Sequence, residues 1–404
     1  ENTGVGFNAL TSNTTATANT AVGYNALAAN TTGASNTTVG HQSLDANTTG
    51  QRNTAVGTNA LTTNTTGQRH AVLGFDALTS NTTGNFNTAV GDIALRENTT
   101  GNLNTAVGIG ALEKNTTGIE NVAVGAETLD AVTTASYSTA VGTAALGAAT
   151  SGGFNTAFGR HAGVGVTTAS GLVLVGERAG GVMTTGGNNT AVGQLSLAAT
   201  TTGATNVAVG TTAGNAITTG ANNTAIGASA NQVTTVGNSN TMLGMLARAS
   251  GADTTQEMVM GYNSVGKGDT TAFINPGTGP VFAGNNATTF SQTSDRRIKK
   301  DIIPNNKGLE SIKQIEPKYF YYKSDEEMQA ELPDAKEGLP LDKQFTSAIA
   351  QELKLIFPEA IKKRTKNNIM SVNTDPIFWS MVNAIKELSA KNDALEARLT
   401  TLEG

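Results

Sequence analysis

The feature that most constrains this chain is a glycine that recurs every 17 residues without a single insertion. The series has sixteen members. Random glycine-rich disorder does not keep such a register, whereas stacked coils must keep it, because each unit lies on the next. The sequence therefore predicts a β-solenoid over residues 1–265, with one coil for each repeat. The glycines are Gly6, Gly23, Gly40, Gly57, Gly74, Gly91, Gly108, Gly125, Gly142, Gly159, Gly176, Gly193, Gly210, Gly227, Gly244 and Gly261.

Other positions of the repeat are nearly as regular as the glycine. The residue before it is apolar in every unit, as at Val22 and Phe158, and the third residue after it is always small. Leucine follows at the next position in the first nine units, from Leu10 to Leu146. Threonine stands eight residues after the glycine fourteen times in succession. We expect the valine and leucine columns to line the interior of the solenoid.

Local propensities favour strands and turns over helices. The segment NTAVG predicts a short strand that ends at the glycine, and NTTG predicts either a second polar strand or a corner. Gly, Thr, Asn and β-branched residues disfavour helix throughout. At a strand spacing of ~4.8 Å, sixteen coils form a rod on the order of 75 Å long. The interior of such a rod is thin, so we expect several chains to pack side by side.

The columns change along the rod. Up to Asn115 the residue seven positions after the glycine is asparagine, whereas Val132 and Ile217 stand there later. Leucine is also lost from its column at Gly163 and Gly180. We therefore expect the distal coils to differ in cross-section or in chain packing.

The repeat NTAVGxxAL is similar to the AVGxxAxA repeats in the heads of YadA-type trimeric autotransporter adhesins. This resemblance implies single-chain β-rolls that are joined as trimers. The strict 17-residue period of this chain departs from that family, so only the architecture carries over.

The composition changes abruptly at Ser294. Residues 1–293 hold 44 of the 47 glycines, with 8 basic and 13 acidic residues, whereas residues 294–404 hold 18 basic and 18 acidic residues. Neither part is basic enough for a nucleic-acid groove. The chain has no cysteine, three scattered histidines and no long apolar run, so we expect no metal, no cofactor and no membrane insertion. The repeat is already in register at Glu1, so we also expect a missing N-terminal region.

Residues 266–293 break the register and contain two prolines, which favours a neck. Four blocks follow in order: SDRRIKKDI, LESIKQIEPKYFYYK, SAIAQELKLIFPEAI and a final segment that begins with DPIFW. Together they resemble the endosialidase-type intramolecular chaperone domain, which sits at the C-terminus of phage tail spikes and tail fibres. The resemblance covers residues 294–404. It implies a small α+β clamp over residues 294–376 that forms trimers and folds the preceding β-structure.

The same resemblance implies a self-cleaving site. Ser294, Asp295, Arg297 and Lys299 match the family pattern, with Ser294 and Lys299 as a catalytic dyad, Asp295 and Arg297 in support, and scission at the bond from Ser294 to Asp295. A partly desolvated lysine can lose its proton at neutral pH and activate a serine hydroxyl. Without the resemblance, these residues would indicate a turn followed by a solvated basic face. The family's Gly-Phe-Ile-Ala-Gln-Glu block is SAIAQE over residues 347–352 here, so clamping without cutting is the alternative.

The last segment, residues 377–404, predicts a helix with two apolar heptad columns. Asn392 lies within one column, and a buried asparagine fixes the register between helices. We therefore expect a parallel, three-stranded coiled coil rather than a helix packed only on its own domain. We expect the aromatic residues near Tyr319 and Trp379 to serve in core and subunit packing. The trimerisation residues are Phe378, Met381, Ile385, Leu388, Asn392, Leu395, Leu399 and Leu402.

These features favour a structural and binding function. We expect a homotrimeric appendage of a phage tail, or of a phage-derived contractile injection system, with the solenoid as shaft and host-binding surface. Its partners would be two further copies of the chain, a tail or baseplate protein bound through the N-terminal region, and a glycan or protein of the host surface. A trimeric adhesin on a bacterial surface is the near alternative.

Two other functions receive less support from the sequence. Polysaccharide hydrolysis needs two carboxylates at a fixed separation, whereas the acidic residues of the repeats are scattered over different coils. Ice binding is suggested by the threonine column, although polar solenoids also use such columns to satisfy their corners. The acidic residues considered are Asp45, Asp76, Asp92, Glu113 and Glu177.

Overall fold

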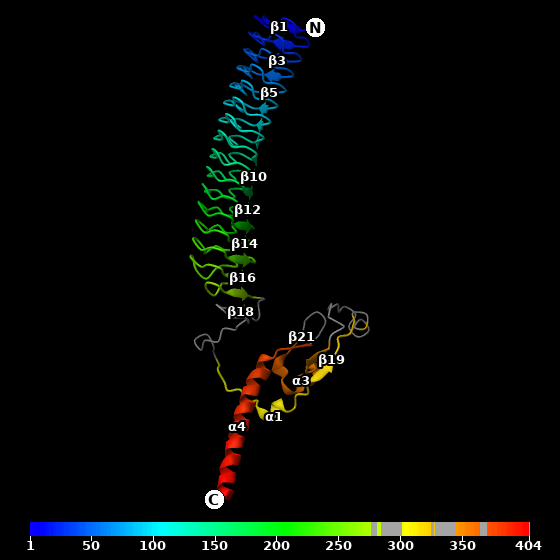
Figure 1. The fold of residues 1–404 in the computed structure, drawn as a ribbon, viewed down its shortest axis with the longest axis vertical. Helices are drawn as coiled ribbons and strands as arrows, with labels where there is room; N and C mark the ends of the chain where they lie inside the picture. Colours follow the sequence, from blue (N-terminus) through cyan, green and yellow to red (C-terminus); the bar gives the residue numbers. More distant parts are fainter. Residues whose placement is uncertain (276–280, 284–300, 325–326, 328–343, 364–369, 404) are drawn as a thin grey trace. The chain divides into compact units, whose positions relative to one another are not determined.

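The structure is a computed structural model that describes residues 1–275, 281–283, 301–324, 327, 344–363 and 370–403. The chain divides into two compact units, Glu1–Thr293 and Ser294–Gly404. In the first unit, short parallel strands stack along a solenoid (Figure 1). Its strands are β1 (Thr3–Val5), β2 (Thr20–Val22), β3 (Thr37–Val39), β4 (Thr54–Val56), β5 (Ala71–Leu73), β6 (Thr88–Val90), β7 (Thr105–Val107), β8 (Val122–Val124), β9 (Thr139–Val141), β10 (Thr156–Phe158), β11 (Val173–Val175), β12 (Thr190–Val192), β13 (Val207–Val209), β14 (Thr224–Ile226), β15 (Thr241–Leu243), β16 (Met258–Met260), β17 (Ala272–Ile274) and β18 (Val281–Ala283).

Consecutive strands pair in parallel, and each residue faces its equivalent 17 positions along, as Thr3 faces Thr20. The predicted mainly-β solenoid of sixteen coils is therefore confirmed. The sheet continues past Val265, because β17 adds to β16 with a spacing of 14 residues and β18 then pairs antiparallel with β17. The NTTG segment is a corner and not a second strand.

The expectation that the valine column lines the interior is wrong. In strands β2 to β17 the middle residue is buried, as Ala55 and Ala106 are, and the residue before the repeat glycine points outward. Leu73, for example, is 52% exposed. The reason is the period of two along a strand: one inward position must have two outward neighbours. The narrow interior accepts alanine at that position.

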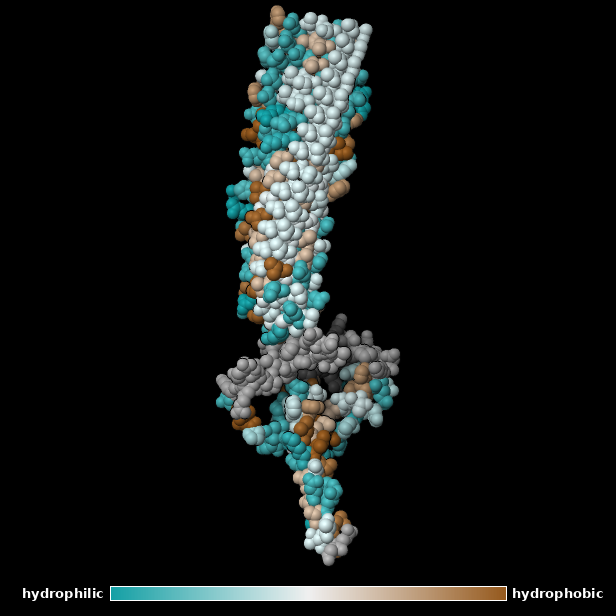
Figure 2. Space-filling model, turned by 60° about the vertical axis from the view of Figure 1, so that its left-hand side comes forward, coloured by the Kyte–Doolittle hydropathy of each residue, from teal (hydrophilic) through white to brown (hydrophobic). Residues whose placement is uncertain are grey.

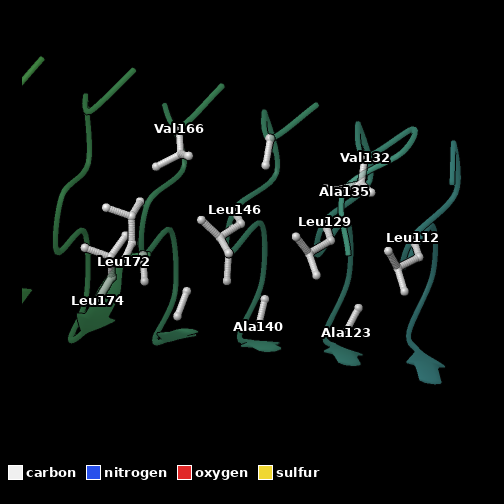
Figure 3. Packing of buried hydrophobic residues seen from close by; sticks show 14 of the residues in the cluster. Leu112, Ala123, Leu129, Val132, Ala135, Ala140, Leu146, Val166, Leu172 and Leu174 are labelled. Carbon is white, nitrogen blue, oxygen red and sulfur yellow. The ribbon is translucent and has the colours of Figure 1, made fainter. Parts of the chain in front are cut away.

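The leucine column does lie in the interior, as expected. Figure 3 shows Leu112, Leu129 and Leu146 side by side on neighbouring coils, opposite the alanines of the strands. The coils that lose this leucine are filled from elsewhere. Around Gly163, the side chains of Leu146 and Leu174 take the space that a Cβ would need.

Buried asparagines hold the corners together. The Nδ2 of each asparagine seven positions after the glycine donates to the Oδ1 of its equivalent on the preceding coil, as Asn64 does to Asn47 at 2.9 Å. The ladder ends at Asn115, whose Oδ1 has no hydrogen-bond partner within the described residues, because Val132 occupies the next coil. Beyond this point the coils keep their 17-residue length and strand pairing, while the column is mostly apolar, with Thr200 and Thr234 as buried polar exceptions.

The second unit is a small α+β module. Its core is formed by Leu353, Phe357 and Ala360, against which Ile312 and Val372 pack. The elements are α1 (Leu309–Ile312), β19 (Lys318–Phe320), β20 (Phe345–Ser347), α3 (Ala350–Ile356), the 3-10 helix η2 (Pro358–Ala360), β21 (Ile361–Lys363), β22 (Met370–Val372) and α4 (Asp375–Glu403). Strands β19 and β20 form one antiparallel pair, and β21 and β22 form another.

The repeat glycine allows a close approach between coils that no other residue permits, which leads to a first prediction. Gly108 has a φ of +136°, and a Cβ built there would lie 2.6 Å from the carbonyl carbon of Gly125 on the next coil. Because backbone cannot move aside, Gly108→Ala should cost more than about 2 kcal/mol and lower the melting temperature. The control is Gly110→Asn on the same coil. Asn59 occupies the equivalent position with a φ of 55°, so this variant should melt like the wild type; equal melting of both variants would contradict the account.

His70 leads to a second prediction, on pH. It replaces an asparagine in a second buried ladder, where its Nε2–H donates to the Gly84 carbonyl at 2.8 Å and its Nδ1 accepts from the Asn87 amide at 3.2 Å. Burial lowers the pKa of His70 to about 4. The unfolded chain binds a proton near pH 6.5 and the folded chain does not, so stability is complete above pH 6.5 and falls as the pH drops towards 4, by roughly 3 kcal/mol.

The matched variant is His70→Asn, because Asn53 makes the equivalent bonds in the ladder. Chemical unfolding at pH 8 and pH 4.5 should show a smaller loss of stability for this variant than for the wild type. The carboxylates titrate in both proteins and cancel in the comparison. An identical pH dependence would show that His70 is not held neutral by the fold.

Candidate functional site

The predicted catalytic residues Ser294, Asp295, Arg297 and Lys299 lie outside the described residues. The description of the module resumes at Asp301. The described residues that follow the dyad bond to helix α4.

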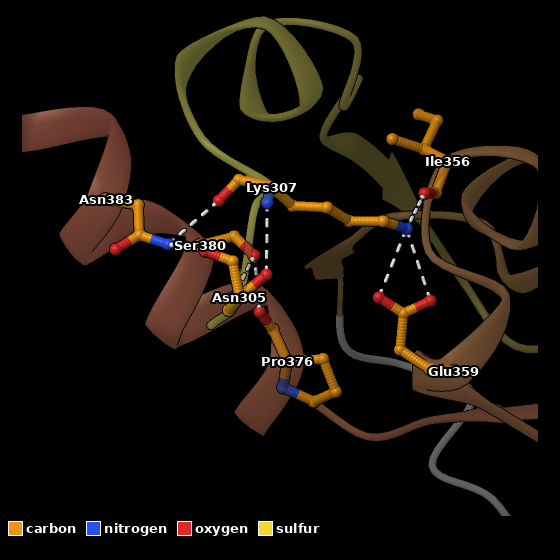
Figure 4. Close-up of polar contacts among 7 residues, drawn as sticks. All are labelled: Asn305, Lys307, Ile356, Glu359, Pro376, Ser380 and Asn383. Atoms are coloured by element: carbon orange, nitrogen blue, oxygen red, sulfur yellow. Dashed lines mark hydrogen bonds and ion pairs between the residues drawn. The ribbon is translucent and has the colours of Figure 1, made fainter. Parts of the chain in front are cut away.

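Residues 305–307 are fastened to the first half of α4 (Figure 4). The Asn305 side chain donates to the Oγ of Ser380 at 3.2 Å, and Ser380 in turn donates to the Pro376 carbonyl at 2.8 Å. The Asn383 side chain donates to the Asn305 carbonyl at 2.9 Å and to the Lys307 carbonyl at 3.2 Å. The chain that leads away from the predicted dyad is thus held by backbone and side-chain bonds to one helix.

The Lys307 side chain extends from this segment to the C-terminal end of α3. Its ammonium group donates to the Ile356 carbonyl, pairs with the Glu359 carboxylate at 3.1 Å and lies 4.6 Å from the centre of the Phe357 ring. These contacts satisfy the end of α3, where a helix leaves carbonyl groups without intrahelical partners. Lys307 therefore ties the segment after the dyad to the core of the module.

Helix α4 uses one face for its own module. Ser380 and Ala384 are buried there, and Ile377 packs on the core. The Glu387 carboxylate accepts a hydrogen bond from the Leu309 amide at the start of α1, at 2.9 Å. The residues on this face are apolar or small, and the polar side chains of Ser380 and Glu387 have hydrogen-bond partners.

The predicted heptad columns occupy a different face of α4, which is exposed. The large apolar residues of the heptads are between 47% and 83% exposed. Asn392 is exposed as well, and it donates to the Glu396 side chain at 3.0 Å. A helix that served only its own domain would not carry this second apolar face. We call these residues the heptad face: Phe378, Met381, Ile385, Leu388, Asn392, Leu395, Leu399 and Leu402.

The aromatic residues of the module divide into two groups. Phe320 and Tyr322 contact each other and the ring of Phe345, although Tyr322 is 36% exposed. Tyr319 and Trp379 are exposed, although Trp379 contacts Phe378 edge to face at 5.1 Å. The exposed pair has no core role within one chain.

The solenoid holds one acidic cluster that the sequence analysis overlooked. Glu113 and Asp130 both stand five residues after their glycines on neighbouring coils, and this shared position was the available signal. Burial raises the pKa of Asp130, while Lys114 lowers it. Arg96 pairs with Glu113 at 2.5 Å. We assign the cluster no catalytic role, because the two basic side chains offset its charge.

Two negative findings apply to the described parts of the chain. No group of three or more acidic or histidine side chains there is placed to hold a metal ion. No helix in those parts has the length and apolar character needed to cross a bilayer.

The contacts of Lys307 generate a third prediction. Lys307→Ala removes an ion pair, a bond to a helix end and a cation–ring contact, and should destabilise the module by about 1–3 kcal/mol. Lys313→Ala, which removes only an exposed pair with Glu310, should cost less than about 0.5 kcal/mol. Hydrogen exchange of α3 and the first half of α4 in the full chain is the measurement. Equal protection in the two variants would show that Lys307 does not hold the segment.

Comparison with known protein families matches part of this module. Residues 294–362 match the family model described as the chaperone of endosialidase. The match begins at the predicted nucleophile and ends before α4. The match covers the first three of the four sequence blocks and confirms the resemblance there, so the second unit carries an endosialidase-type chaperone domain.

Proposed function

We propose that this protein is a homotrimeric, fibre-like appendage of a phage tail or of a phage-derived injection device. The solenoid is its shaft and host-binding surface. The C-terminal module is an intramolecular chaperone that brings three chains together before the coils fold. The protein would then act outside the producing cell, as part of the particle that meets the host.

The observation that carries the proposal is the heptad face of α4. Ile385, Leu388 and Leu395 are each more than half exposed, while the neighbouring face of the same helix is buried against α1 and the core. Burying such a face gains about 25 cal/mol for each Å² of apolar surface, and identical helices can bury it against one another. The number three comes from the family resemblance.

The order of events follows from the solenoid. Its pairings join residues 17 apart, and its sixteen coils present nearly the same columns, so chains could pair in a shifted register. A C-terminal clamp that assembles first removes this freedom, because it sets the ends of the three chains level. The solenoid can then extend coil by coil from the clamp.

We extend the proposal to self-cleavage at Ser294. In this scheme Lys299 is the base that takes the proton of the Ser294 hydroxyl, and Asp295 and Arg297 support the site. The anchoring of residues 305–307 to α4 supports the idea, because the chain that follows the predicted cleavage site is bonded to the helix that would assemble. Cutting would then follow assembly, as it must if the clamp is to do its work first.

We do not extend the proposal to ice binding or to hydrolysis of polysaccharide. The threonine hydroxyls eight positions after the glycine donate to carbonyls of the next coil, as Thr48 does to Thr65 at 3.0 Å. They therefore satisfy the corners of the solenoid. The acidic cluster at Asp130 does not provide a free carboxylate pair, because Lys114 lies near Asp130 and Arg96 pairs with Glu113.

A fourth prediction tests the dyad. Ser294→Ala should abolish the cut, and so should Lys299→Arg, because a guanidinium keeps the charge but does not act as a base at neutral pH. Mass spectrometry of the purified wild-type assembly should show two species, one ending near Ser294 and one of about 110 residues. Trimer formation should survive in both variants.

Two outcomes would contradict this scheme in different ways. A single intact wild-type species would show that the module clamps without cutting. Two species that persist in Lys299→Arg would show that the base is another residue. Neither result touches the clamping role, which is measured separately by the mass of the assembly.

A further inference from the structure

The outward residue before each repeat glycine is apolar in all sixteen coils. It is Val in most coils and Leu, Ile, Phe or Met in the others. An outward strand position that faces water is normally polar, as alternation along a half-buried strand requires. The column nine positions after the glycine behaves in that way: it is threonine or serine in thirteen successive coils, from Thr15 to Thr219. The apolar column is therefore not a general property of this surface.

Large apolar side chains gather around the same strands. We define the strand face as the residues one, three and five positions before the glycine and the residue directly after it. All but three of the 25 exposed large hydrophobic residues in residues 1–265 lie on it; the exceptions are Val182, Val236 and Val265. Figure 2 shows a pale strip of residues of intermediate hydropathy along the solenoid, with both brown hydrophobic and teal hydrophilic residues at its edges. The apolar residues are thus concentrated and not scattered.

The area of the strand face suits a second protein chain. Sixteen coils at ~4.8 Å extend about 75 Å, and the face is roughly 10–20 Å wide from the strand alone to its flanking columns. This gives on the order of 750–1,500 Å² for each chain, against the ~800 Å² that each partner buries in a standard stable interface. Exposed apolar side chains that gather on one face of a protein mark an interaction site.

The aromatic residues of the face are arranged for packing and not for holding a sugar. The rings of Phe7, Tyr24 and His41 stack on one another at 5.4 and 5.1 Å, and those of Tyr137 and Phe154 stack at 4.9 Å. Stacked rings cover each other's faces and offer their edges to the surroundings. A sugar ring packs on an aromatic face, whereas an apolar neighbour can pack on a row of edges.

We propose that the strand face is the surface through which copies of this chain pack side by side, parallel and in register. The inference rests on the proposed trimer and adds where the chains touch. Each copy brings the same column to the same height, so the apolar column before the glycine meets its equivalents in the other copies along the solenoid. The polar threonine corners then form the outside of the assembly.

The experiment uses the absence of cysteine from the chain. Val175→Cys places a thiol on the strand face, and Val182→Cys places one on the same coil but off that face. Both valines are exposed in the single chain, at 37% and 50%. A water-soluble maleimide is added to each variant of the full chain, purified as the assembled species, and again in denaturant.

The assembled Val175→Cys variant should react at least tenfold more slowly than assembled Val182→Cys, and the two should react alike in denaturant. Equal rates in an assembly of trimer mass would overturn the strand face as the interface and leave the trimer intact. A wild-type chain that sediments as a monomer would overturn both the interface and the proposed function. As a second readout, Val175→Lys should lower the melting temperature of the solenoid, while Val182→Lys should not.

Discussion

The structure depends on the close contact between backbones at the repeat glycine. The amide of Gly108 donates to the Val90 carbonyl of the preceding coil at 2.8 Å, and the position of its missing Cβ is occupied by the backbone of Gly125. This contact recurs on every coil and forbids insertions, because one extra residue would move the glycine out of the contact. From it follow the parallel in-register strands, the inward alanine and leucine columns and the asparagine ladders. In such a β-solenoid the register between neighbouring coils of one chain is fixed. The coils themselves are nearly identical to one another.

Because the coils are so similar, a separate module is needed to set the register between chains. Two chains with nearly identical coils can slide by about 4.8 Å and meet almost the same partners, so the solenoid cannot set the register between chains. The C-terminal module differs from the repeats in every respect: it is charged, its core contains Phe357 and Leu353, and its long helix has two faces with separate uses. One face packs on the module itself, and the heptad face is left for other copies. The segment after the predicted dyad is held by the first of these faces, through Ser380 and Asn383.

Much of the fold could be predicted from the sequence because repetition amplifies weak signals. A single Gly or Leu says little, but sixteen glycines and nine leucines in register predict the coil and its core. The sequence does not show which apolar residue of the strand is buried, because Ala and Val are both apolar and the larger Val is the more obvious core residue. Only the pleat of a three-residue strand decides between them. The proximity of Glu113 to Asp130 is not evident along the sequence, because neighbours in a solenoid are 17 residues apart. The dyad at Ser294 and Lys299 stays a prediction that rests on the family.

The central claim is that the heptad face joins chains, and the mass of the assembly tests it most directly. Sedimentation equilibrium of the full chain carrying Ser294→Ala keeps the clamp attached whatever the chemistry. We expect a single species of three times the chain mass of 41.1 kDa. We also expect that adding Ile385→Asp and Leu388→Asp, which place charges on the heptad face, reduces this mass to that of one chain. A monomer before these changes, or an unchanged trimer after them, would contradict the account.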